Sequence, residues 1–306
     1  MVKEGYDTRF AIALTACSSV MGVIIPPSIL MVVWGGVMQI SVGALFLAGA
    51  IPGLLIGFAL MATVYGYAKV YDYPIALKPT FAEFCSAFKG AALAMLTPIF
   101  VIGGIVGGIV TSTESAIIAA GYALILGVFV YRTVTFKELG HIFYDTGRFA
   151  SISLFAIGTA SAFGWMLAFY NVPRLIVDAM TAHEFGMIGT SLIIAALFLF
   201  FGLFIDAIPT IIILGTVLMP VATAAGIHPI AFAIIVIISL AFGLVTPPYG
   251  LCLLISASIG GMNVVSVMHD VCIILAPMLL ILLLLILFPE IALWLPRTLM
   301  PNTFQG

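Results

Sequence analysis

Charged residues are scarce in this sequence. Asp, Glu, Lys and Arg make up 7% of its 306 residues, whereas soluble domains carry roughly 25%. None of the four occurs between Phe10 and Ala68. This composition excludes a soluble domain and indicates an integral membrane protein. The formal net charge of −2 also argues against nucleic-acid binding, which depends on a basic surface.

Cysteine and histidine are equally sparse, with four of each. They are scattered, and no C-x-x-C pair or metal-ligand spacing occurs. We therefore expect no disulfide framework, no metal centre and no cofactor. An intramembrane aspartyl protease would need two embedded aspartates, and only Asp206 is embedded in an apolar stretch. The chain is not expected to be an enzyme, and no catalytic residue is predicted.

Long apolar windows are abundant. The clearest lie at 43–68, 149–170 and 271–289, and about 20 apolar residues suffice for a helix to cross a bilayer. No strict alternation of polar and apolar residues suggests strands. The sequence predicts an all-α polytopic membrane protein in which 1–306 form a single membrane domain.

An internal repeat links two proline pairs. The stretches that begin at Gly5 and Gly226 are 221 positions apart and align without a gap. This offset carries Gly22 onto Gly243 and the pair at 26–27, in "GVIIPPSILM", onto the pair at 247–248, in "GLVTPPYGLC". Because two prolines cannot continue a helix, the repeat predicts two copies of a broken helix, the first at 5–39 and the second within 187–259. Two simple proline kinks are the alternative.

Basic residues suggest the topology, since Lys and Arg concentrate at cytoplasmic ends. Residues 94–131 are too long for one crossing and are expected to enter and return, with a break at 111–114. The second part of the stretch 69–89 suggests a short interfacial helix, and 187–222 a re-entrant hairpin from the outside. This path leaves only Arg174 and Arg297 of the ten basic residues outside. It also makes the two repeats antiparallel.

Some polar residues stay inside the apolar stretches. Asp206 and Glu114 have no embedded Lys or Arg to neutralise them, so a cation, a proton or a helix end must do so. A protonated or hydrogen-bonded structural carboxylate is the alternative for both. Carbonyl groups freed at a proline break are hard oxygen donors, and the next half-helix offers N–H groups to an anion. Hydroxyl groups at the two breaks and near Asp206 would add ligands, although serines can also bond back to their own helix.

The motifs "IPPS", "TSTESA", "LFIDAIPTI" and "GLVTPPYGL" occur here in the order in which they occur in one transporter family. From Gly5 to about Pro289 the chain resembles the large permease subunit of tripartite ATP-independent periplasmic (TRAP) transporters, the DctM family. The resemblance implies an elevator-type fold with inverted repeats, broken helices and hairpins in the bacterial inner membrane. It also implies sodium-driven import of an organic acid such as a C4-dicarboxylate or a sialic acid, with sodium as the coupling ion.

The resemblance further implies two partners, a small DctQ-like membrane subunit and a DctP-like periplasmic substrate-binding protein. It puts two sodium sites at the breaks and the hairpin tips, and the substrate between Ser28 and Thr246. The residues of the first ion site are Ser18, Ser19, Gly22 and Pro26, and those of the second are Asp206, Thr210, Gly243, Thr246 and Pro247.

Two features depart from the family pattern. Cys252 stands where the family commonly has asparagine. The second broken helix follows a hairpin but the first does not, so about 100 residues, a hairpin and a few spans, are expected to be missing before Met1. We therefore expect an N-terminally truncated member of the family. The alternatives are a related ion-coupled carboxylate transporter without a binding protein, or an inactive fragment.

Overall fold

The computed structural model describes residues 1–73, 79–181 and 185–301, so that Lys78, one of the basic residues in the topology argument, lies outside the described residues. The described residues form helices and turns without a strand, and seven helices are long and apolar enough to cross a membrane. The chain divides into two compact units. We call them unit 1, residues 1–74 with 159–306, and unit 2, residues 75–158.

The core of unit 1 surrounds α12 (Pro229–Gly243), in which every residue from Ile230 to Gly243 is buried. A helix that is apolar on all sides is expected at the centre of a bundle. Its neighbours include α9 (Gly186–Gly202), α4 (Val42–Val70) and α14 (Val264–Leu287). The short helices η1 (Val2–Glu4), α8 (Val172–Thr181) and α15 (Glu290–Leu299) also belong to this unit.

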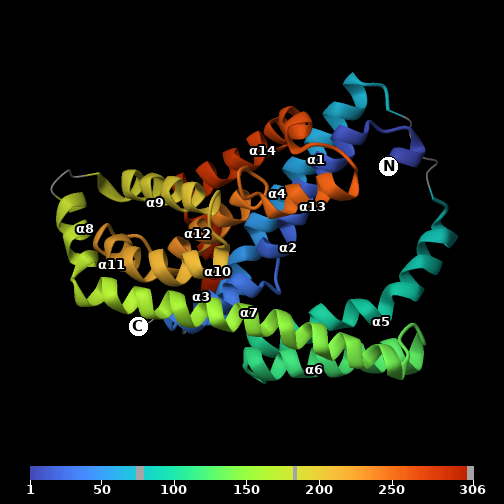
Figure 1. Ribbon diagram of the computed structural model, residues 1–306, viewed down its shortest axis with the longest axis horizontal. Helices are drawn as coiled ribbons and strands as arrows, with labels where there is room; N and C mark the ends of the chain where they lie inside the picture. Colours follow the sequence, from blue (N-terminus) through green and yellow to red (C-terminus); the bar gives the residue numbers. More distant parts are fainter. Residues whose placement is uncertain (74–78, 182–184, 302–306) are drawn as a thin grey trace. The chain divides into compact units, whose positions relative to one another are not determined.

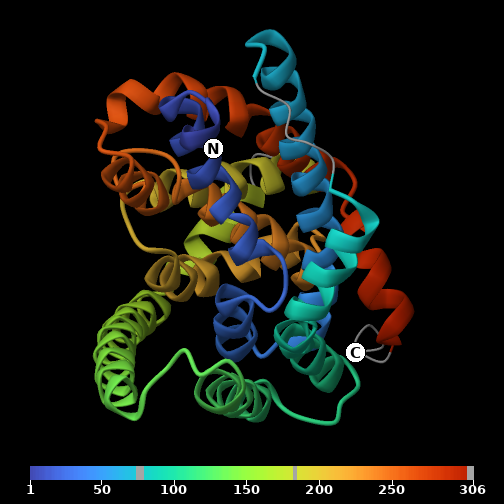
Figure 2. The same cartoon turned by 90° about the vertical axis from the view of Figure 1, so that its right-hand side faces the viewer.

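Both predicted broken helices are present, and their boundaries repeat. The first consists of α1 (Thr8–Ser19), α2 (Met21–Ile24) and α3 (Ile29–Met38), and the second of α12 and α13 (Leu251–Ile259). The offset of 221 residues relates the first residue of α1 to that of α12, and the last residue of α3 to that of α13. The interruption in the first copy, drawn in dark blue, is visible in Figure 2. In both copies the bond between the two prolines is cis.

The halves of the two copies pack crosswise. The leading half of the first copy, α1, contacts the trailing half of the second, α13, and the leading half of the second, α12, contacts the trailing half of the first, α3. α12 also contacts α2, the last helical turn before the first break. Packing of leading halves on trailing halves is what two copies running in opposite directions produce. The contacts therefore agree with the predicted antiparallel repeat.

Unit 2 contains α5 (Phe81–Val106), α6 (Ser112–Ile125), the π-helical turn η2 (Leu126–Val130) and the first part of α7 (Phe136–Phe169). Helices α5 and α6 contact each other and are joined at 107–111, next to the predicted break. Two expectations here were wrong. The second part of 69–89 forms no separate interfacial helix, because α5 runs unbroken from Phe81 to Val106. The span expected at 149–170 already begins at Phe136.

A Thr-x-x-Glu capping box explains these early helix starts. Glu83 accepts the backbone N–H of Thr80 at 2.7 Å, and Glu138 accepts that of Thr135 at 2.7 Å. Glu114 does the same for Thr111 at 2.8 Å. Two otherwise unpaired donors are satisfied at each such helix start. Glu114 therefore has the structural role that was one of its two alternatives.

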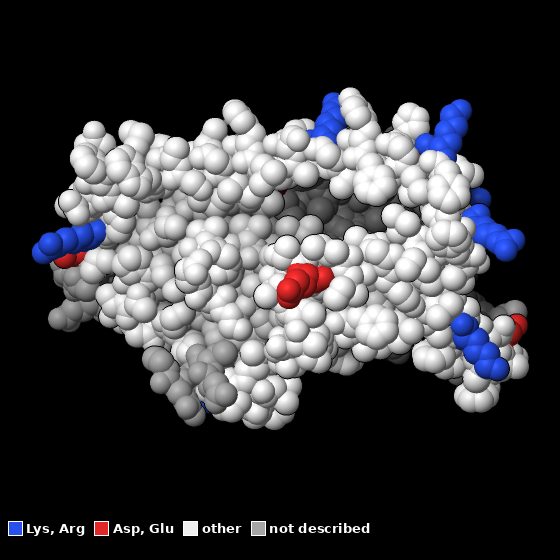
Figure 3. All heavy atoms as spheres, turned by 90° about the horizontal axis from the view of Figure 1, so that it is seen from below, with Lys and Arg blue, Asp and Glu red and all other residues white. Residues whose placement is uncertain are grey.

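The surface is as apolar as a membrane protein requires. Large hydrophobic side chains such as Phe155, Trp165 and Phe169 are at least 66% exposed. In the face shown in Figure 3, charged side chains are few and uncharged atoms cover most of the area. Such a surface is suited to lipid rather than to water.

Three glycines of α4 pack against the segment that leads into the first break. A Cβ atom on Gly49 would lie 2.8 Å from the carbonyl oxygen of Ile24, and one on Gly53 would lie 2.5 Å from Cγ1 of Ile25. One turn further on, Gly57 meets Met21 in the same way. Small residues at i, i+4 and i+8 let two backbones approach closely. This stripe holds the broken segment against α4.

We expect Gly49→Ala to lower the free energy of unfolding by about 1–3 kcal/mol, because the added methyl group overlaps a backbone carbonyl that cannot move freely. Gly66→Ala, on the same helix, has open space around its Cβ position and should be neutral or stabilising by up to about 1 kcal/mol. Thermal unfolding of the detergent-purified variants measures the difference. Equal midpoints for the two variants would contradict the close packing.

Candidate functional site

The segment 187–222 forms a hairpin of two helical arms. The first arm is α9, and the second consists of α10 (Ala207–Thr210), the π-helical turn η3 (Ile211–Gly215) and α11 (Thr216–Ala224). The arms run side by side in Figure 1 and contact each other. Residues 203–206 form the tip between them.

Asp206 occupies the last position of this tip. It precedes α10 in extended backbone conformation, is partly exposed, and makes no side-chain capping bond to the helix. Thr210 is buried, and its hydroxyl group donates to the carbonyl oxygen of Asp206 at 2.8 Å. A hydroxyl that donates its proton in this way keeps lone pairs for a further ligand.

The tip is bound directly to the second break. The backbone N–H of Tyr249, just after the proline pair, donates to the carbonyl oxygen of Leu203 at 2.8 Å. Gly243 packs on Gly202 at the end of the first arm, where an added Cβ would lie 2.6 Å from the carbonyl carbon of Gly202. Hairpin and second broken helix thus meet backbone to backbone.

Polar groups at the second break form hydrogen bonds with the backbone of the same broken helix. The hydroxyl group of Thr246 donates to the carbonyl oxygen of Phe242 at 2.9 Å, and the N–H of Cys252 donates across the break to Leu244 at 2.9 Å. Gly250 has a φ of 31°, in the left-handed region that glycine enters at no steric cost. Pro247 lies between these bonds and is partly exposed. Cys252, the departure from the family pattern, contributes its backbone here.

The first break is organised around Ser28, which is 1% exposed. Its hydroxyl group donates to the carbonyl oxygen of Val23 and accepts the N–H of Met31, which makes Ser28 the N-cap of α3. The hairpin approaches this half-helix as well, because both α10 and η3 contact α3. The hairpin tip therefore has the second break on one side and the start of the first trailing half on the other.

The remaining residues predicted for the first ion site lie on a more open face. Ser18 and Ser19 are exposed, and their hydroxyl groups donate to the carbonyl oxygens of Thr15 and Ala16, at 3.2 and 2.7 Å. This is the back-bonding alternative, with i−3 acceptors. Gly22 has nothing within 4 Å of its Cβ position, whereas its counterpart Gly243 is covered by the hairpin, and Pro26 is partly exposed.

Two contributors to this region escaped prediction. The offset of 221 that was found from the prolines also carries Ser18 onto Ser239, which is fully buried and donates to Ile235 at 2.7 Å. That signal was readable in the sequence. The role of Gly202 was not, because nothing local predicts which glycine meets the second break.

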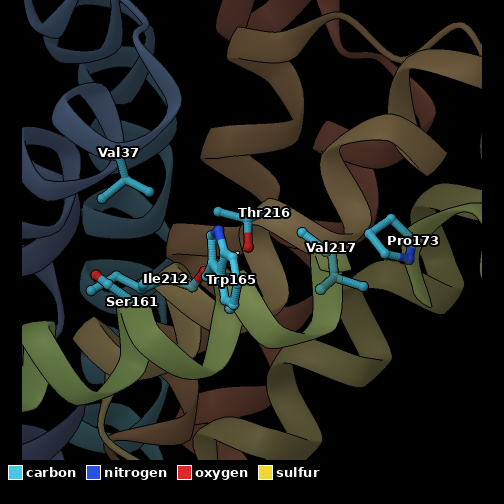
Figure 4. A pocket seen from close by; sticks show the side chains of 9 residues that line it. Val37, Ser161, Trp165, Pro173, Ile212, Thr216 and Val217 are labelled. Atoms are coloured by element: carbon cyan, nitrogen blue, oxygen red, sulfur yellow. Dashed lines mark hydrogen bonds between the residues drawn. The ribbon is translucent and has the colours of Figure 1, made fainter. Parts of the chain in front are cut away.

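A cavity of about 270 Å³ lies beside the hairpin in unit 1. Figure 4 shows Ser161 and Trp165 of α7 facing Ile212 and Thr216 of the second arm, with Val37 of α3 at one side. Its lining is largely apolar and includes none of the residues predicted to bind ion or substrate. Within 1–73, 79–181 and 185–301, no three His, Cys, Asp or Glu side chains group to hold a metal ion.

This architecture defines an α-helical membrane protein of the inverted-repeat class, in which discontinuous helices meet a hairpin. Comparison with known proteins is more specific. The family model described as "Tripartite ATP-independent periplasmic transporter, DctM component" matches residues 1–291. The chain belongs to this family, which confirms the resemblance, and it is a multi-pass protein of the bacterial inner membrane rather than an enzyme.

Curated relatives agree. The chain is 37% identical over 301 residues to the sialic acid TRAP transporter permease protein SiaT of Haemophilus influenzae, covering 98% of this chain and 49% of SiaT. It is 36% identical to the sialic acid large permease protein SiaM of Vibrio cholerae, covering 95% and 68%. It is 30% identical to the C4-dicarboxylate large permease protein DctM of V. cholerae, covering 98% and 71%. The chain thus spans about half to 71% of these relatives.

The start of the second broken helix is sensitive to protonation. Nδ1 of His228 accepts the N–H of Ile230 at 3.2 Å and caps α12. Burial lowers the pKa of His228 from 6.5, the charge of Arg297 lowers it further, and Glu290 opposes both. A lowered pKa means that the unfolded chain binds the proton more readily, so His228 contributes stability above pH 6.5 that is lost as the pH falls through its folded-state pKa.

We therefore expect the midpoint of unfolding to fall between pH 7.5 and pH 5, and to fall less in His228→Asn, because asparagine caps a helix without titrating in this range. Thermal unfolding of both proteins across this pH range measures the difference. Parallel pH profiles would show that His228 contributes nothing to the pH dependence.

Proposed function

We propose that this chain is the permease component of a sodium-coupled importer of an organic acid, working in a TRAP transporter. Family membership supports the transporter class, and the names of two relatives point to sialic acid and one to C4-dicarboxylates. The observation that carries the proposal is the junction of the hairpin tip with the second break. There the backbone N–H of Tyr249 donates to the carbonyl oxygen of Leu203, the first residue of the tip that ends at Asp206.

The chemistry of this junction suits a small cation. The Asp206 carboxylate makes no side-chain capping bond to the helix it precedes, and a carboxylate in a membrane needs a compensating positive charge. Carbonyl, hydroxyl and carboxylate oxygens are the ligands of hard cations. The proposed sodium ligands are drawn from Asp206, Thr210, Gly243, Thr246 and Pro247, and a second set from Ser18, Ser19, Gly22 and Pro26.

The substrate carboxylate is proposed to lie between Ser28 and Thr246. Ser28 is the N-cap of α3, and the N-terminal turn of a helix offers N–H groups and partial positive charge to an anion. Contacts of α10 with α3 support a position of the substrate beside the hairpin. An elevator movement of hairpin and broken helices would carry ion and substrate together.

The proposed partners are a small DctQ-like membrane subunit and a DctP-like periplasmic binding protein. A related carboxylate transporter without a binding protein is the alternative. Co-purification of the complete protein with its small subunit, and dependence of uptake on added binding protein, separate these two functions. Uptake that needs neither would favour the alternative.

We expect Asp206→Asn to raise the sodium concentration for half-maximal uptake about tenfold, equivalent to ~1.4 kcal/mol, because the amide carries no charge. The measurement is uptake of radiolabelled substrate by proteoliposomes holding the complete transporter, over a range of NaCl at constant ionic strength. Glu114→Gln is the matched control, since glutamine preserves the capping box, and should leave the sodium dependence unchanged. An unaltered sodium curve in Asp206→Asn would remove Asp206 from the ion site.

A further inference from the structure

A second cavity in unit 1, of about 210 Å³, lies at the base of the hairpin. The first arm of the hairpin, α9, has 17 residues, so its base lies about 25 Å from the tip, where the ion is proposed to bind. The start of α9, the turn before α12, the end of α14 and one side of α15 form the walls of the cavity. It is therefore separate from the candidate ion and substrate sites.

The floor of this cavity is apolar. Ile235 of α12, Ile286 of α14 and Leu293 of α15 line it, and each is buried. The hydroxyl group of Ser191, which is buried as well, donates to the carbonyl oxygen of Met187 at 2.8 Å. Such a floor accepts hydrocarbon more readily than charge.

Charges of both signs lie at the rim. Glu290 and Arg297 line the cavity from α15, and their side chains are 65% and 50% exposed. They are joined by two bonds, from Nη1 to Oε2 at 2.7 Å and from Nη2 to Oε1 at 3.3 Å. His228, whose Nδ1 caps α12, lines the cavity as well. An ion pair as exposed as this one contributes little to stability, so its two members can exchange each other for the charges of a ligand.

The rim lies where the chain leaves the membrane. α14 is long and apolar enough to cross a membrane and ends at Leu287, and α15 begins at Glu290. Along with the charged pair, α15 exposes Trp294 and Leu299. Tryptophan and short amphipathic helices are typical of the membrane–water interface. Lipid head groups therefore lie at the level of the rim.

The charge pattern restricts the ligand. A metal cation would meet a single carboxylate with a guanidinium bonded to it, and a simple anion would meet the guanidinium with a carboxylate bonded to it. A ligand with one negative and one positive group on a short spacer complements both. None of the described residues that line the cavity is aromatic, whereas quaternary ammonium groups are bound in aromatic cages. A primary ammonium group, which donates hydrogen bonds to a carboxylate, is the better match.

We propose that this cavity binds the head group of a zwitterionic phospholipid with a primary ammonium group, as in phosphatidylethanolamine. Arg297 binds the phosphate, because the planar guanidinium matches two phosphate oxygens, and Glu290 accepts hydrogen bonds from the ammonium group. The apolar floor takes the glycerol ester region of the lipid. The bound lipid links α15 to the base of the hairpin. This inference rests on the fold of unit 1 and does not depend on the proposed function.

Native mass spectrometry of the detergent-purified chain measures lipid binding directly. The probes are dioleoyl phosphatidylethanolamine, phosphatidylcholine and phosphatidylglycerol at equal concentrations, and phosphatidylethanolamine should bind most tightly. Arg297→Gln should weaken its binding about tenfold, as expected for loss of a charge-assisted hydrogen bond. Arg174→Gln, which removes an exposed arginine from the short helix α8, is the matched control and should bind like the wild type. Equal binding of the three lipids by the wild type, or unchanged binding in Arg297→Gln, would overturn the proposal.

Glu290→Gln provides a second test that does not depend on the folded fraction. It removes the acceptor of the ammonium group and should abolish the preference for phosphatidylethanolamine over phosphatidylglycerol, a ratio measured within one sample. A ratio equal to that of the wild type would contradict the proposed role of Glu290. Glycerophosphoethanolamine, the same head group without acyl chains, should bind at least about tenfold more weakly than the lipid. Equally tight binding would identify a soluble zwitterion as the ligand and overturn the assignment to a lipid.

Discussion

The rest of the structure depends on how backbone groups are satisfied where a helix breaks inside a membrane. Each unpaired N–H or carbonyl group in hydrocarbon destabilises the fold by several kcal/mol, on the order of a large part of a protein's net stability. At the second break, backbone carbonyl groups accept bonds from the N–H groups of Tyr249 and Cys252 and from the hydroxyl group of Thr246. At the first break Ser28 does much of this work with a single hydroxyl group. The breaks are therefore ordered features that can hold ligands in fixed positions.

The two breaks are related by the repeat but are packed differently. The second break lies against the hairpin through the contact between Gly202 and Gly243. The first lies against α4 through Gly49 and Gly53, while Gly22, the counterpart of Gly243, faces open space. The junction of hairpin and second break is thus the more enclosed of the two candidate ion sites in the described residues.

Long-range features of the fold were predictable because they leave a periodic trace. The proline repeat defined the starts of α1 and α12, and the ends of α3 and α13, with one offset. The start of α7 at Phe136 was missed because the residues before 149 are polar and were not assigned to the membrane span. The Thr-x-x-Glu capping box at Thr135, which marks this start, can be read in the sequence. In the candidate site, Asp206 and Thr210 could be placed on one hairpin from their spacing. The partner Gly202 could not, since glycine is common in this chain and only tertiary packing selects the one that meets the second break.

We propose that the hairpin tip and the second break act as one sodium-binding unit. Hydrogen–deuterium exchange of the complete protein, in NaCl and in KCl at equal ionic strength, tests this directly. We expect sodium to slow exchange in peptides covering 203–210 and 244–252 together, and potassium to leave it unchanged. Equal exchange in the two salts, or sodium protection confined to other segments, would contradict it.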